Sequence, residues 1–141
     1  MTIQDLTGMV ITEIRDNAAV TAIVGQKTRP EWGANEGPPG VIIEGLGIDY
    51  DPGGGTRRLR LQAPTFIAKC YGTNRPQARQ VANAVVEAVN LRSARKDSSG
   101  RLIYLSLVDS GGDMDVDPVT KWPHADVVFS VLGAQLAAAV P

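Results

Sequence analysis

Residues 109–112 (Asp-Ser-Gly-Gly) form the run that could hold a catalytic nucleophile. An activated serine needs a histidine base within hydrogen-bond reach and an acid that orients the imidazole. The chain has one histidine, His124, and it follows Ser110. In chymotrypsin-like proteases, which carry such a loop, the histidine comes well before the serine, and 141 residues are too few for their double barrel. We therefore expect a glycine-rich turn that leaves a strand, without catalytic residues.

Alternating aspartates follow directly. Asp113, Asp115 and Asp117 are spaced as at the start of a calcium loop. Such a loop requires glycine at its sixth position and a bidentate glutamate at its twelfth. Those positions hold Pro118 and His124 here. The sequence therefore predicts a solvated acidic loop over residues 110–123 and no metal site.

The remaining reactive or glycine-rich positions do not match a phosphate-binding, dinucleotide-binding or zinc site. Residues 53–56 (Gly-Gly-Gly-Thr) lack the lysine of a P-loop and enter a strand, and the Gly45 to Gly47 run has neither the third glycine nor the helix of a dinucleotide fingerprint. One cysteine and one histidine cannot supply the roughly four ligands of a usual zinc site. Cys70 shares its strand parity with apolar residues, which predicts a buried, inert thiol. His124 is expected at the surface or at a strand edge, and no cofactor is expected.

Basic and aromatic residues mark the candidate interface. Arg57, Arg58 and Arg60 form a basic cluster beside the glycine run. The cluster fits an exposed strand edge protected by charge, or a contact to an acidic neighbour or to passing nucleic acid. Trp32 and Trp122 lie in proline-containing loops. A tryptophan there usually pins the loop to the core, and tryptophan is also enriched at interface hot spots.

Composition bounds the class of protein. The chain is 43% hydrophobic and 21% charged, with a net charge of −1, as in an ordinary globular domain. General nucleic-acid binding is disfavoured, because phosphate contacts normally require a basic excess. A single cysteine makes no internal disulfide. The N-terminus lacks the pattern of a signal peptide, and no run approaches the ~20 apolar residues of a membrane span, so we expect a soluble chain that stays in a cytoplasm.

Hydrophobic periodicity then predicts the elements that position these residues. A helix is expected over 2–16, with a capping box of Thr2 and Asp5, followed by a short helical turn over 18–24 that Asn17 caps and Gly25 closes. Residues 26–40 form a connector. A second helix is expected over 74–91, capped by Asn74; its apolar stripe consists of Ala78, Val81, Ala82, Val85, Ala88 and Val89.

Strands are expected over 41–48, 58–72, 101–109 and 125–133. The second of these should bend at Pro64, with one extra residue there and a first half that extends beyond the main sheet. The order predicts a single α+β domain over 1–141 with roughly four mostly antiparallel strands, the N-terminal and central helices packed on one face, and a long flexible loop between the first two strands. Residues 49–63 are expected to form a flexible arm, and 134–141 a frayed tail.

Three runs carry a family resemblance: residues 18–25, 37–43 and 68–78, the last being a strand that enters a capped helix. Together with the two late strands, they resemble the tail-terminator (tail-completion) proteins of long-tailed, non-contractile bacteriophages. The similarity covers nearly the full chain as a pattern of elements, without a catalytic signature or a portable set of site residues.

The resemblance implies a hexameric ring that caps the tail tube, stops its polymerisation and presents a surface to the head connector or stopper protein. Such a protein is no enzyme and uses no cofactor. DNA passes through its lumen without specific binding, and it is assembled in the host cytoplasm into the head-proximal end of the virion tail. A neighbouring neck or connector subunit is the alternative, followed by a small α+β module that binds peptide or nucleic acid.

Two hypotheses on contact sites follow for such a ring. The arm over 49–63 would meet the tail tube or the adjacent subunit, at an entropic cost that several arms together overcome. Asp113, Asp115 and Asp117 would lie on a ring face or near the lumen, where their charges would repel DNA phosphates.

Overall fold

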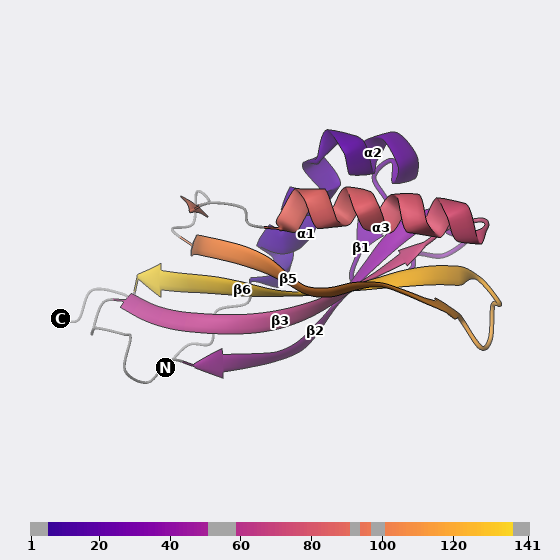
Figure 1. The fold of residues 1–141 in the computed structure, drawn as a ribbon. Coiled ribbons are helices and arrows are strands. Elements are labelled where there is room, and N and C mark those ends of the chain that lie inside the picture. Colours follow the sequence, from indigo (N-terminus) through magenta and orange to yellow (C-terminus); the bar gives the residue numbers. More distant parts are fainter. Residues whose placement is uncertain (1–5, 51–58, 91–93, 97–100, 137–141) are drawn as a thin grey trace.

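The computed structural model describes residues 6–50, 59–90, 94–96 and 101–136. Within these ranges, two helices are followed by three strands, a third helix and three more strands (Figure 1). In order they are α1 (Thr7–Asp16), α2 (Ala18–Val24), β1 (Thr28–Arg29), β2 (Gly40–Tyr50), β3 (Leu59–Tyr71), α3 (Arg75–Val89), β4 (Arg95–Lys96), β5 (Arg101–Val116) and β6 (Pro123–Leu136).

One mixed sheet holds all six strands, in the order β1-β2-β3-β6-β5-β4. β1 is parallel to β2, and every other neighbouring pair is antiparallel. The helices lie together on one side of this sheet (Figure 1). The predicted α+β class and the one-sided helical layer are therefore confirmed. The sheet exceeds the predicted four strands because β1 and β4, of two residues each, are too short to show a periodicity.

The helix caps predicted at Asn17, Gly25 and Asn74 are present in the structure. The Asn17 side chain accepts hydrogen bonds from the backbone N–H groups of Ala19 and Val20, and α2 ends at Gly25 with a φ of 63°. The Asn74 side chain accepts from the backbone N–H of Gln77 at the start of α3. α1 begins at Thr7, with Leu6 as its N-cap, so the predicted start at residue 2 is wrong; the capping box predicted for Thr2 and Asp5 lies outside the described residues.

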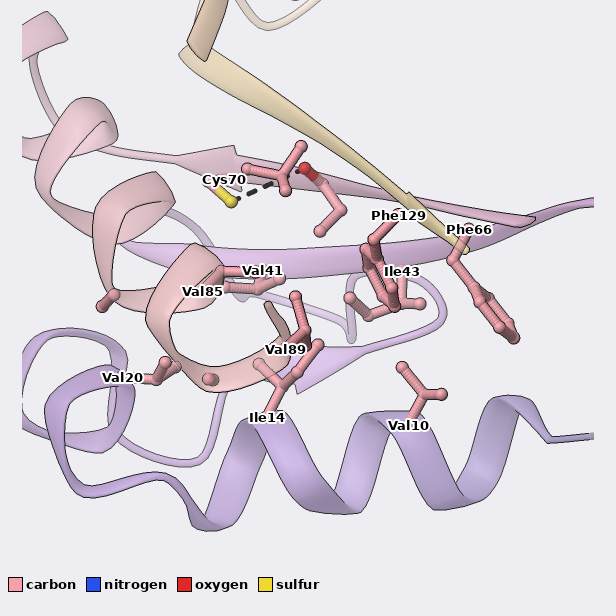
Figure 2. Close-up of a cluster of buried hydrophobic side chains, with 14 of the residues drawn as sticks. Val10, Ile14, Val20, Val41, Ile43, Phe66, Cys70, Val85, Val89 and Phe129 are labelled. Carbon is pink, nitrogen blue, oxygen red and sulfur yellow. Dashed lines mark hydrogen bonds between the residues drawn. The ribbon is translucent and has the colours of Figure 1, made fainter. Parts of the chain in front are cut away.

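The core lies between the helical layer and the sheet. Figure 2 shows Val10 and Ile14 of α1 pointing toward the side chains that the sheet and α3 contribute. Phe66 of β3 and Phe129 of β6 stack with their ring centroids 5.5 Å apart. All six residues of the predicted α3 stripe are buried, and their small size lets the helix lie close to the sheet.

The irregularity expected at Pro64 occurs on the neighbouring strand. β3 and β6 keep one register from Leu59 to Tyr71, although Ala63 and Pro64 are not paired in that ladder. The register shift lies in β2, between Gly45 and Gly47. Proline removes a ladder donor, and the extra residue on the neighbouring strand is Leu46, between the two glycines of β2. The first half of β3 does not leave the sheet either, because residues 59–62 pair with β6 and residues 62–64 pair with β2.

The predicted acidic loop over 110–123 is wrong for most of its length. β5 continues to Val116 and pairs with β6 as far as Pro123, so only residues 117–122 form the connection. β5 shifts register three times along β6, the last time between Gly111 and Asp113. The glycines and aspartates that suggested a loop thus belong to an irregular strand, whose outer side pairs with β4 only at Leu102 and Ile103.

Parts of the predicted arm (49–63) and of the predicted frayed tail (134–141) are paired as strand. Asp49 pairs with Ala63 and Tyr50 with Gln62, so the predicted arm is strand at both ends, and its middle, 51–58, lies outside the described residues. β6 continues to Leu136, which pairs with Leu59. The predicted frayed tail is therefore strand up to Leu136, and 137–141 lie outside the described residues.

Candidate functional site

Four ring side chains gather at one end of the sheet, on the side opposite the helices, which we call the open face. The Trp32 ring centroid lies 5.3 Å from that of Tyr71 and 5.5 Å from that of Trp122, both in edge-on geometry. The Tyr71 ring lies 4.9 Å from the His124 ring. Edge-on contacts are a favoured geometry for aromatic pairs. Both tryptophans therefore hold their loops to the sheet, while their role at an interface stays a prediction.

Gly40 makes room for this aromatic cluster. A Cβ at Gly40 would lie 2.6 Å from the Trp32 ring, so a side chain there would displace the indole from β2. The backbone N–H of Gly72 also donates to the carbonyl of Pro123, which ties the end of β3 to the start of β6. The loop before β2 and the turn before β6 are thus joined at one place.

His124 is buried, with 6% of its surface exposed, so its prediction as a surface or edge residue is wrong. The extension of β5 to Val116 places His124 between Tyr71 of β3 and Asp115 of β5. Its Nδ1 lies 2.6 Å from Oδ1 of Asp126. Burial raises the pKa of Tyr71 to about 12, helped by the charges of Asp117, Asp126 and Glu44.

The turn over 117–122 is a fixed structure. Asp117 Oδ1 accepts hydrogen bonds of 2.9 Å from the backbone N–H groups of Val119 and Thr120. These bonds stabilise the carboxylate and hold the pKa of Asp117 below its usual value. The Asp117 N–H also donates to the carbonyl of Trp122. Asp117 therefore shapes the turn, which its assignment to an acidic surface did not anticipate.

The other predicted site residues are dispersed. Asp113 and Asp115 lie in β5, and their proposed place near a lumen stays a prediction. Arg60 lies in β3, whereas Arg57 and Arg58 lie outside the described residues. Ser110 pairs with Val128, four residues along β6 from His124, a separation of about 13 Å at strand spacing. The serine and the histidine therefore do not form a catalytic pair.

Cys70 is fully buried, as predicted. Its thiol donates to the carbonyl of Ala68 over 3.5 Å, the contact drawn as a dashed line in Figure 2. Burial, with a contribution from Asp126, raises the pKa of the Cys70 thiol well above its usual range. Among the residues that the structure describes, no group of three or more His, Cys, Asp or Glu side chains is placed to hold a metal ion.

A polar cluster around Arg95 was not predicted from the sequence. Arg95 of β4 donates to Glu13 of α1 through Nε at 2.5 Å and through Nη2 at 2.7 Å. The same Nη2 lies 3.2 Å from Oγ of Ser106, and Ser106 Oγ donates to the carbonyl of Val89. Glu13 is 82 positions from Arg95 in the sequence, and Ser106 is 11 positions from it. Helix and strand periods relate only nearby residues, so they do not predict these contacts. The cluster joins β4, β5 and two helices.

The open face carries an apolar patch farther along the sheet. Ser106 and Val108 face the helices, so Leu107 faces the other way, opposite Ser130 of β6. Leu107 is 42% and Leu132 39% exposed. With the half-buried Ile67 and Val128, a directly paired couple on β3 and β6, they form what we call the open-face patch. Solvated sheet faces usually carry polar residues at such positions.

A short polar row crosses this patch. Ser130 Oγ donates to Oδ2 of Asp109 over 2.5 Å and lies 3.4 Å from Oγ1 of Thr65. Farther along, Lys69 and Glu44 form an ion pair of 3.3 Å. The Ser130 and Thr65 hydroxyls are thus hydrogen-bonded within the chain, and among the described residues of this face Leu107 and Leu132 are the apolar side chains most exposed to solvent.

Comparison with known proteins identifies the fold and no family. The sequence matches no family model and no curated protein. The structure is similar to a chain in the virion of a native gene transfer agent particle, with a TM-score of 0.65 and 13% sequence identity. The match covers 89% of this chain and 91% of the other, so the two share the whole fold. Within the described residues, no helix is long and apolar enough to span a membrane.

Proposed function

We propose that this chain is a structural virion protein that forms a ring, caps the tail tube and presents the surface that joins the head connector. The observation that carries the proposal is the whole-chain similarity to a component of a gene transfer agent virion. The resemblance of residues 18–25, 37–43 and 68–78 to tail terminators supports the specific role in the tail.

The open face supports a role in assembly. Leu107 of β5 and Leu132 of β6 are exposed on it, on neighbouring strands. Grouped exposed apolar side chains mark sites of protein contact. In this proposal the partners are further copies of the chain, the tail-tube protein and the connector, and the protein acts in the particle by binding, without catalysis.

The mass of the assembled species tests the proposal. Native mass spectrometry should find six copies of the 15.0 kDa chain, alone or after addition of the cognate tail-tube protein. Electron microscopy of that mixture should show a ring at one end of each tube, and tubes that no longer grow at that end.

Each alternative gives a distinct result. A chain that stays monomeric with tubes present would overturn the proposal. A ring that binds the isolated connector and ignores tubes would identify a neighbouring neck subunit instead. Duplex DNA binding that weakens steeply with salt, without a ring, would identify a nucleic-acid-binding module.

A further inference from the structure

We draw no further inference here: the strongest candidate, the open-face patch of Ile67, Leu107, Val128 and Leu132 on β3, β5 and β6, carries no proposal because nothing in the structure shows what covers it.

Discussion

At the scale of single residues, the fold requires glycine at position 72, because a side chain there would clash with the start of α3. A Cβ at Gly72 would lie 2.3 Å from the backbone nitrogen of Ala78 and 2.8 Å from the carbonyl oxygen of Asn74. Both atoms belong to the first turn of α3 or its cap, which cannot move without shifting the helix. Because Gly72 has no side chain, α3 can begin directly after the end of β3.

We predict that Gly72→Ala lowers the free energy of unfolding by about 2–3 kcal/mol, as overpacking against fixed atoms does. Gly8→Ala is the matched control, because no heavy atom lies within 4 Å of the position a Cβ would take there. Because Gly8 is an exposed position of helix α1, this substitution should raise the free energy of unfolding by about 0.5 kcal/mol. Urea denaturation followed by circular dichroism measures both, and equal effects of the two substitutions would contradict the explanation.

At the scale of elements, an ion pair links the short strand β4 to helix α1. β4 has two residues, and its Arg95 reaches Glu13 of α1 with two hydrogen bonds. Both side chains are largely withdrawn from solvent. Removing one partner of such a pair leaves the other charge without compensation, whereas removing both leaves no charge to solvate.

Arg95→Met should therefore cost about 2–3 kcal/mol of stability, and Glu13→Leu a similar amount. The double variant should recover most of the loss, giving a coupling energy above about 1 kcal/mol in a double-mutant cycle. Chemical denaturation of the four proteins provides the measurement. Additive losses would show that the two side chains stabilise the fold separately.

At the scale of the whole molecule, one core serves both layers. α3 packs on β3, β5 and β6, and the buried side chains of all three helices join those of the sheet in a single cluster. Trp32 and Trp122 lie on the open side, and the helices on the other. Tryptophan fluorescence and far-ultraviolet circular dichroism thus report on opposite sides of the sheet.

Because these sides share one core, both signals should change at the same urea concentration, with equal slopes, in a single transition. Tryptophan fluorescence that changes at a lower urea concentration than the helical signal would show that the aromatic cluster unfolds by itself. A Trp32→Phe variant, which leaves Trp122 as the reporter, would then identify the loop that detaches first.

The sequence by itself determined the features that arise within one element. The caps at Asn17 and Asn74 were predictable because a side-chain oxygen meets backbone donors two or three residues away. The buried stripe of α3 and the inward parity of Val127, Phe129 and Val131 follow from the helix and strand periods. The α+β class follows from the order of those elements.

Only the tertiary structure decided which distant residues meet. Pairing with β6 turned an apparent loop into the end of β5, and that extension buried His124. Trp32 and Trp122, 90 positions apart, come into ring contact, and Arg95 finds Glu13 across 82. Period and capping are properties of neighbouring residues, whereas these contacts depend on the free energy of packing the whole chain, which no local pattern contains.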